Sequence, residues 1–322
     1  MEIAAEELGP VAGHEVAKNE FLSVLAADKL HHGWLLRGPR GVGKARLALQ
    51  FAARLLGGAS LAGLSVDADD AVGRLIVAGS HPDFRIIRRP LDDKGKMKTE
   101  IPVDSVRELS AFFSLRPAMG GWRVAIIDAV DELNRFGANA LLKTLEEPPG
   151  KSVLLLVSHG EQALLPTVRS RCRVLSCRPL SEVETIEALK LGQMPQARAE
   201  EVAKLAPGRP GRALAVQGPE SDSAVGAVRN ALRTIDRVDA GTLHAALTLA
   251  AKSDVALGAA IDTLRSSLQK RAARELDPVV AGEWATVVLD VIRLEAEARE
   301  LNMDKAQTIS AALSRVARLA RG

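Results

Sequence analysis

The stretch Gly38-Pro39-Arg40-Gly41-Val42-Gly43-Lys44-Ala45 decides the fold of this chain. It follows the pattern G-x-x-x-x-G-K of a phosphate-binding loop, in which a Ser or Thr comes next. In that pattern the glycines let backbone N–H groups face a phosphate, the lysine reaches the terminal phosphates, and the hydroxyl binds Mg²⁺. Ala45 instead offers a methyl group where the metal needs an oxygen ligand. The residues kept for phosphate binding are Gly38, Gly41, Gly43 and Lys44.

The sequence on both sides of the loop predicts a strand before it and a helix after it. Residues 34–36 are a short apolar run, and residues 44–56 carry apolar side chains at steps of three and four. A strand, a glycine loop and a helix in this order point a helix N-terminus at an anion. The alternative is a loop that survives only as a connection between a strand and a helix.

The first half of the chain alternates between predicted strands and helices. Apolar runs at 84–87, 124–127 and 153–157 predict strands, and the last two are typical of strands buried on both faces of a parallel sheet. Apolar stripes predict helices at 103–113 and around 138–145. This alternation indicates an α/β domain with a parallel sheet. We place this P-loop domain at residues 1–178.

After Pro179 the pattern changes to helices alone. Ser181 and Glu184 form a plausible capping box for a helix that reaches Leu191. Shorter helices are predicted at 195–205 and 212–216. We therefore expect a small helical domain at 179–220 and an all-α domain, rich in Ala, Leu, Val, Arg and Glu, at 221–322. Residues 57–79 have no clear period, and we predict no structure for them.

Composition describes an ordinary globular protein and excludes little. Hydrophobic residues make up 47% of the chain and charged residues 26%. Aromatic residues make up 3% and Tyr is absent, which argues against stacking platforms for single-stranded nucleic acid. The net charge of +3 is too small to indicate nucleic-acid binding by itself.

Targeting and cysteine usage predict a cytoplasmic protein. No apolar run reaches the length that spans a bilayer, and the acidic N-terminus is unlike a secretory signal. The two cysteines, Cys172 and Cys177, are too few for a disulfide framework or a four-cysteine zinc site. We therefore expect reduced thiols and no metal.

A second position near the expected phosphate site also lacks a catalytic side chain. Asp128 stands at the tip of the predicted strand 124–127, where an acidic residue beside a phosphate loop usually contacts Mg²⁺. ATPases of this general plan commonly place a Glu next, to polarise the attacking water, and here Ala129 fills that place. Asp131 and Glu132 lie further on, where acidic residues also serve simply as favourable charges near a helix N-terminus.

Two catalytic positions, 45 and 129, thus carry alanine. Each loss would slow hydrolysis by orders of magnitude, and each tenfold decrease corresponds to about 1.4 kcal/mol of barrier. The sequence therefore argues against intrinsic ATP hydrolysis.

Two further positions have more than one interpretation. Ser158, at the end of the predicted strand 153–157, either contacts a γ-phosphate or simply ends the strand. Arg171 lies in the motif Ser170-Arg171-Cys172. An arginine offered to the nucleotide of a neighbouring subunit stabilises charge in phosphoryl transfer; the alternative is a solvated basic edge.

Several motifs together resemble the clamp-loader branch of the AAA+ proteins. The resemblance is carried by residues 139–149 (NALLKTLEEPP) and 166–172 (PTVRSRC). His81-Pro82-Asp83 and the run 103–107 (VDSVR) stand at the places that this family leads one to expect. The resemblance is specific over about residues 10–178, weaker over 207–213, and without motif support beyond residue 220.

The resemblance implies a non-catalytic subunit of a five-subunit complex that loads the sliding clamp at primer–template DNA during replication. Its partners would be the gamma or tau ATPase subunits and the delta subunit. Arg171 would reach the ATP of the adjacent ATPase subunit. Residues 179–220 would form a lid, with Arg212 near a nucleotide-sensing position, and residues 221–322 would form an oligomerisation collar. Some members of the family carry a four-cysteine zinc module after the phosphate loop, and this chain has no Cys there.

Two alternatives stay open on the sequence. One is a working, gamma- or tau-like ATPase subunit that recruits Asp131 or Glu132 in place of the missing side chains. The other is a subunit that binds ATP or ADP without hydrolysing it, since Lys44 and the glycines remain. We expect weak nucleotide binding or none.

Overall fold

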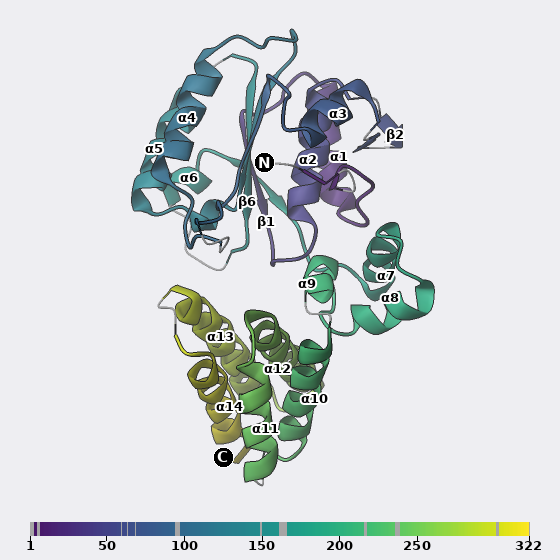
Figure 1. The fold of residues 1–322 in the computed structure, drawn as a ribbon, viewed down its shortest axis with the longest axis vertical. Coiled ribbons are helices and arrows are strands. Elements are labelled where there is room, and N and C mark those ends of the chain that lie inside the picture. The colour runs from purple at the N-terminus through teal and green to yellow at the C-terminus, as the bar shows by residue number, and fades with distance from the viewer. Residues whose placement is uncertain are drawn as a thin grey trace. The chain divides into compact units, whose positions relative to one another are not determined.

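The computed structural model divides into two compact units, Met1–Met194 and Pro195–Gly322 (Figure 1). The boundary falls inside the segment 179–220, for which the sequence predicts a separate helical domain; that three-domain division stays a prediction. The structure describes residues 3–4, 7–58, 60–62, 64–67, 69–93, 97–148, 150–160, 166–215, 218–235, 239–300 and 303–321.

The first unit is built on a five-stranded sheet in the order β4-β5-β6-β1-β7, in which every pairing is parallel. The predicted α/β class and parallel sheet are therefore confirmed. The strands are β1 (Gly33–Arg37), β4 (Phe84–Ile87), β5 (Arg123–Asp128), β6 (Ser152–Ser158) and β7 (Arg173–Ser176). The sequence predicts four of them. It missed β7, a short edge strand with only two apolar residues, Val174 and Leu175.

Helices cover both faces of this sheet (Figure 1). One face carries α1 (Glu15–Ala26), α2 (Lys44–Leu55) and α3 (Ala71–Val77). The other carries α4 (Val103–Ser114), α5 (Arg135–Glu146) and α6 (Pro166–Arg169). The predicted helices at 44–56, 103–113 and around 138–145 are thus confirmed as α2, α4 and α5.

Successive residues of the central strands pack on opposite faces. In β1, Trp34 and Leu36 join the core under α1 and α2, whereas Leu35 joins the core under α4 and α5. The same alternation runs along β6. This is the period of two that a pleated strand imposes, and burial on both faces explains why these strands are continuous apolar runs.

The segment 57–79, for which no structure is predicted from the sequence, contains a small hairpin and a helix. The strands β2 (Ser60–Ala62) and β3 (Ser65–Val66) pair antiparallel, and α3 follows. Asp70 caps α3 by accepting a hydrogen bond from the backbone N–H of Val72 at 3.1 Å. Strands of two and three residues are too short to produce a readable periodicity.

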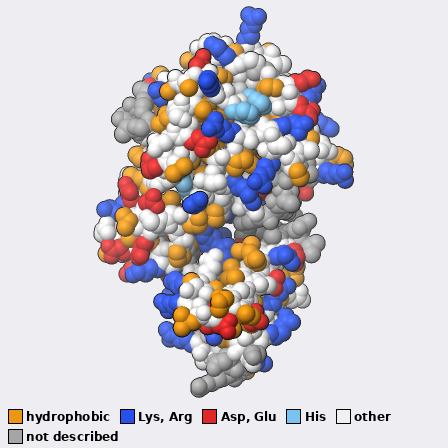
Figure 2. Space-filling model, turned by 180° about the vertical axis from the view of Figure 1, so that it is seen from behind, with side chains coloured by type: hydrophobic (Ala, Val, Ile, Leu, Met, Phe, Trp, Pro, Cys, Tyr) orange, Lys and Arg blue, Asp and Glu red, His pale blue; other side chains and the backbone are white. Residues whose placement is uncertain are grey.

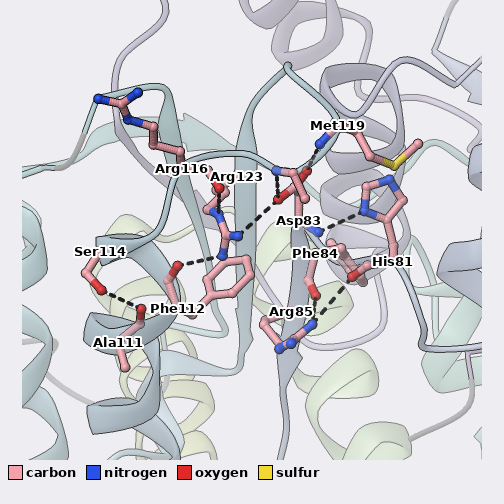
Figure 3. A network of polar contacts seen from close by, with 11 residues as sticks. His81, Asp83, Phe84, Arg85, Ala111, Phe112, Ser114, Arg116, Met119 and Arg123 are labelled. Atoms are coloured by element: carbon pink, nitrogen blue, oxygen red, sulfur yellow. Dashed lines mark hydrogen bonds and ion pairs between the residues drawn. The ribbon is translucent and has the colours of Figure 1, made fainter.

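The motif His81-Pro82-Asp83 ties the connection before β5 to β4 (Figure 3). The buried Asp83 carboxylate accepts hydrogen bonds from the backbone N–H groups of Ala118 (2.8 Å) and Met119 (2.9 Å), and it pairs with the buried Arg123 at 3.3 Å. Arg123 also donates to the carbonyl of Phe112 at 2.7 Å. The motif therefore has a structural role, because it satisfies buried backbone groups and a buried charge together.

The predicted capping box is present at α7 (Glu182–Leu191), the last helix of the first unit: the Ser181 side chain and the Glu184 backbone meet, and Glu184 bonds back to Ser181. The second unit contains helices α8 (Gln196–Ala203) and α9 (Pro210–Ala215), as the sequence predicts apart from small shifts of the ends. Position 216 lies outside the described residues.

The rest of the second unit is a helical bundle, and its described residues contain no strand. Its apolar core includes Ile261, Leu264, Trp284, Val291 and Leu313. The predicted all-α character is confirmed. Its helices are α10 (Pro219–Arg233), α11 (Ala240–Ala250), α12 (Asp254–Arg274), α13 (Pro278–Glu300) and α14 (Lys305–Arg321).

Two surface properties bear on the partners of the chain: the distribution of charge and the hydropathy of the helices. Basic and acidic side chains are interspersed on the face of the molecule in Figure 2. Within the described part of the chain, no helix combines the length and apolar character needed to cross a membrane.

Candidate functional site

The phosphate-loop glycines are required by the backbone that they occupy. The loop connects β1 to α2. Gly41 and Gly43 have φ values of 87° and 101°, in the region that favours glycine. A Cβ at Gly38 would lie 1.8 Å from the carbonyl oxygen of Cys177, so no side chain fits there. The glycine pattern therefore has a conformational reason that holds without a bound phosphate.

Lys44 is turned into the loop itself. Its Nζ donates to the carbonyl oxygens of Gly38 (2.7 Å) and Pro39 (2.6 Å), and the residue is 3% exposed. Burial lowers the pKa of Lys44 from 10.5 to about 8. Lys44 would have to break both of these hydrogen bonds to reach a phosphate.

Asp128, the expected metal ligand, pairs with an internal cation. Its Oδ2 lies 3.2 Å from Nε of Arg88, whose Nη2 lies 2.9 Å from Oε2 of Glu7. Burial raises the pKa of Asp128, and the Arg88 guanidinium opposes that shift. The Arg88 guanidinium thus pairs with Asp128, whose counterpart in working ATPases contacts a metal ion.

Ser158 and Asp131 bond to each other. The buried Ser158 hydroxyl donates to Oδ1 of Asp131 at 2.9 Å, and the backbone N–H of His159 donates to Oδ2 of the same carboxylate. Asp131 stands in the short helix η2 (Val130–Glu132) directly after β5. The Ser158 hydroxyl is therefore directed at Asp131, and its proposed contact with a γ-phosphate stays a prediction.

Glu132, the other candidate for water activation, is held by two arginines. Nη2 of Arg40, from the phosphate loop, lies 2.9 Å from its carboxylate, and Nε of Arg89 lies 2.8 Å away. Ala129 is buried, and its side chain has no polar atom. Both acidic residues that could replace the missing glutamate are thus engaged by groups of the chain itself.

The structure brings the predicted pocket residues of the first unit together. Residues 38–44, Asp128 and Ser158 follow or end β1, β5 and β6, which are neighbours in the sheet and parallel. Carboxyl ends of parallel strands meet at one edge, where open α/β sheets bind ligands. Sequence reasoning missed the arginines that fill this edge. The signal for two of them was present, because Arg88 and Arg89 directly follow β4, the neighbour of β5.

Arg171 lies at the opposite edge of the same sheet, where the amino ends of the strands meet. It lies two residues before β7, which pairs in parallel with β1, whereas the phosphate loop follows β1. A five-residue strand spans about 16 Å. Arg171 is therefore a strand's length from Lys44 of its own chain.

The side chain of Arg171 is partly exposed and is held mainly by two close contacts, besides a longer one of 3.5 Å from Nη1 to the Ser170 hydroxyl. Its Nη1 donates to the carbonyl of Thr167 at 3.0 Å, and its Nη2 lies 2.8 Å from Oε1 of Glu146. Neighbouring Arg173 instead pairs with Glu20 at 2.7 Å and lies over the ring of Trp34. Arg171 and Arg173 thus have different surroundings.

Arg212 belongs to the second unit, where it is paired within that unit. It bonds to the buried Asp262, and its Nη2 lies 3.5 Å from Glu295. Arg209 and Arg265 each lie 2.8 Å from the same Asp262 carboxylate. These contacts fix α9 to α12 and α13. The nucleotide-sensing role of Arg212 stays a prediction.

The described residues contain no cluster of His, Cys, Asp and Glu that could hold a metal ion. Burial raises the pKa of Cys172 to about 12 and that of Cys177 to about 11. Both thiols are therefore protonated at neutral pH, which is not the state that binds a metal. The expectation of no zinc stays a prediction.

Comparison with known proteins places the first unit in a family. The family model described as "DNA polymerase III, delta subunit" matches residues 13–181. The chain belongs to this DNA polymerase III family. The match covers β1, the phosphate loop, Asp128, Ser158 and Arg171.

Individual relatives agree with this assignment. Over 189 residues the chain is 37% identical to DNA polymerase III subunit delta′ of Pseudomonas aeruginosa, which covers 58% of this chain and 56% of that protein. It is 35% identical over 144 residues to subunit delta′ of Escherichia coli, 44% of this chain and 42% of that protein. The chain thus spans about half the length of these relatives.

Relatives named as gamma or tau subunits also match. DNA polymerase III subunit tau/gamma of Haemophilus influenzae is 33% identical over 181 residues, which is 56% of this chain and 25% of that protein.

Proposed function

We propose that this chain is a non-catalytic, delta-prime-like subunit of the bacterial DNA polymerase III clamp loader. In this role it acts in the cytoplasm and helps the ATP-dependent loading of the sliding clamp during DNA replication. Membership of the DNA polymerase III family supports the assignment to this complex. The observation that carries the non-catalytic role is Lys44, which is bonded to the carbonyls of its own loop beside an alanine at position 45.

Arg171 would serve a neighbouring subunit rather than its own pocket. It is partly exposed, and it stands at the edge of the sheet opposite its own phosphate loop. A cation brought to the nucleotide phosphates of a gamma or tau subunit would stabilise the charge that develops in phosphoryl transfer. An arginine that does so is called an arginine finger, and measured fingers raise the rate by roughly 10³–10⁵. The chain itself would need no cofactor, and ATP, ADP and zinc would bind weakly or not at all.

The helical parts would support this task. Residues 179–220 would act as the lid, with Arg212 at its nucleotide-sensing position, and residues 221–322 as the collar that holds gamma or tau and delta subunits. The sliding clamp and primer–template DNA would be reached through the complex.

The test is ATP turnover by the reconstituted complex, with this subunit either wild type or Arg171→Ala. Arg169→Ala is the matched control, because Arg169 is also exposed and has no ion pair among the described residues. We expect Arg171→Ala to remove the turnover of the ATP site that this subunit serves, and Arg169→Ala to leave turnover unchanged. Both complexes should elute as intact assemblies. Equal turnover in the wild-type and Arg171→Ala complexes would remove the finger role.

The similarity to a tau/gamma subunit keeps a second candidate, a working ATPase that uses Asp131 or Glu132. Turnover of ATP with Mg²⁺ by the isolated chain, abolished in Lys44→Met, would favour it. Equilibrium titration of the isolated chain with ATP separates this candidate from a subunit that binds nucleotide without hydrolysis.

A further inference from the structure

Arg171 is held by contacts that use only part of its hydrogen-bonding capacity. A guanidinium carries five N–H donors. One nitrogen, Nη1, donates to the carbonyl of Thr167 at 3.0 Å, and the other, Nη2, pairs with Glu146 at 2.8 Å. The side chains of Arg171 and Glu146 are 36% and 49% exposed. The pair therefore lies at the surface, and donors remain for an anion that approaches from solvent.

Glu146 and Arg171 belong to segments that pack against each other in the first unit. Glu146 is the last residue of α5. The preceding carbonyl, that of Leu145, lies 3.1 Å from Nε2 of His32 at the entry to β1. At Gly33, the position of an added Cβ would be only 3.0 Å from the Leu145 side chain and 3.3 Å from the Cys172 sulfur. The end of α5 and the Ser-Arg-Cys segment thus pack closely around the start of β1.

We propose that Glu146 is a positioning residue that holds the Arg171 guanidinium in the conformation in which it meets a neighbouring subunit's phosphates. The inference rests on the proposed finger role of Arg171. A free arginine side chain has about 2 kcal/mol of rotamer entropy to lose on docking. A carboxylate that already fixes one end of the guanidinium reduces that loss, which is how preorganisation increases affinity.

The adjacent residue provides a matched control. Glu147 has the same charge and is also exposed. Its backbone N–H bonds to the carbonyl of Lys143, but its side chain has no hydrogen bond or ion pair among the described residues. A general effect of negative charge near the finger would be the same for both glutamates, whereas positioning requires Glu146.

The experiment measures ATP turnover by the reconstituted complex at saturating ATP, clamp and primed DNA. The subunit carries Glu146→Ala, Glu147→Ala, Arg171→Ala or the double change Glu146→Ala with Arg171→Ala. An exposed ion pair contributes a factor of about 2 to 5 at the site that it serves. We therefore expect Glu146→Ala to remove about half to four-fifths of the turnover that Arg171→Ala removes.

Two further readouts separate positioning from a structural effect. The double variant should match Arg171→Ala alone, because Glu146 acts only through the arginine. Glu147→Ala should behave as wild type, and all variants should assemble and melt normally. The difference between wild type and Glu146→Ala should decrease as salt is raised, since exposed pairs are screened.

Each remaining outcome counts against one specific claim. If Arg171→Ala has no effect, the finger role itself fails. If Arg171→Ala lowers turnover but Glu146→Ala does not, the finger stands and the positioning role of Glu146 is wrong. Higher turnover in Glu146→Ala would also overturn it, because Glu146 would then restrain the finger. An effect of Glu146→Ala that persists in the Arg171→Ala background would assign Glu146 a structural role instead.

Discussion

The charged side chains at the two edges of the parallel sheet in the first unit differ in how they are paired. At the edge formed by the carboxyl ends of the strands, Lys44, Asp128 and Glu132 are each engaged by carbonyls or arginines of the same chain. At the other edge, Arg171 is partly exposed and is held by one surface carboxylate. This contrast indicates that a nucleotide pocket can lose its catalytic side chains and keep its backbone shape, because carbonyls and arginines of the same chain take the place of the bound nucleotide. Substitutions at the first edge should therefore alter stability, and substitutions at the second should alter what the complex does.

The largest stability effect is expected at Gly38. In Gly38→Ala the new Cβ meets the carbonyl oxygen of Cys177 at 1.8 Å, so the backbone of the loop or of the segment after β7 must move. We predict a loss of about 3 kcal/mol in the free energy of unfolding, measured by urea denaturation. Gly150→Ala is the control, because nothing lies within 4 Å of its added Cβ. Equal midpoints for the two variants would show that the loop is not held as described.

A pH effect is expected at Lys44. Its pKa is lowered to about 8 by burial, whereas the unfolded value is 10.5. Between these pH values the unfolded chain keeps a proton on Lys44 that the folded chain has released, so stability rises with pH. Relative to Lys44→Met, the wild type should gain about 2–3 kcal/mol between pH 8 and pH 10.5. A constant difference between the two proteins would mean that the ammonium is solvated rather than buried.

A smaller effect is expected at Arg88. Arg88→Gln leaves the Asp128 carboxylate without its cation, and a lost hydrogen bond to a charged group costs about 1–3 kcal/mol. The loss should shrink as pH falls and Asp128 becomes protonated, because the neutral carboxyl does not need a cation. Denaturation of both proteins at neutral and acidic pH measures it. A loss that does not depend on pH would assign the effect to packing of the Arg88 side chain.

The smallest stability effect is expected at Arg171. Its pair with Glu146 is exposed, and such pairs contribute about 0–1 kcal/mol. Arg171→Ala should therefore unfold within about 1 kcal/mol of wild type in the isolated chain. A much larger loss would indicate a structural role and would weaken the contrast between the two edges.

The sequence predicts the frame of the site because that frame follows from periodicity. Continuous apolar runs identify β5 and β6, and the glycine pattern identifies the turn between β1 and α2. Since parallel strands end at one edge, Lys44, Asp128 and Ser158 had to meet there. The short segments are the exception: β7 and the hairpin β2–β3 are too small to carry a period.

The partners of these residues could not be predicted in the same way. Arg40 with Glu132, and Arg88 with Glu7 and Asp128, join side chains that are distant in sequence and meet only in the folded unit. The same is true of Glu146 and Arg171, which come from α5 and from the turn after α6. An ion pair forms only where the two charged groups come within about 4 Å, so it depends on side-chain geometry that no sequence spacing specifies.

The most direct test compares Lys44→Met and Arg171→Ala side by side in the reconstituted complex, with ATP turnover as the readout. We predict unchanged turnover for Lys44→Met, because the nucleotide pocket of this chain is already filled by groups of the chain itself, and reduced turnover for Arg171→Ala. Reduced turnover for Lys44→Met together with unchanged turnover for Arg171→Ala would contradict a disarmed pocket and an arginine that acts on a neighbouring subunit.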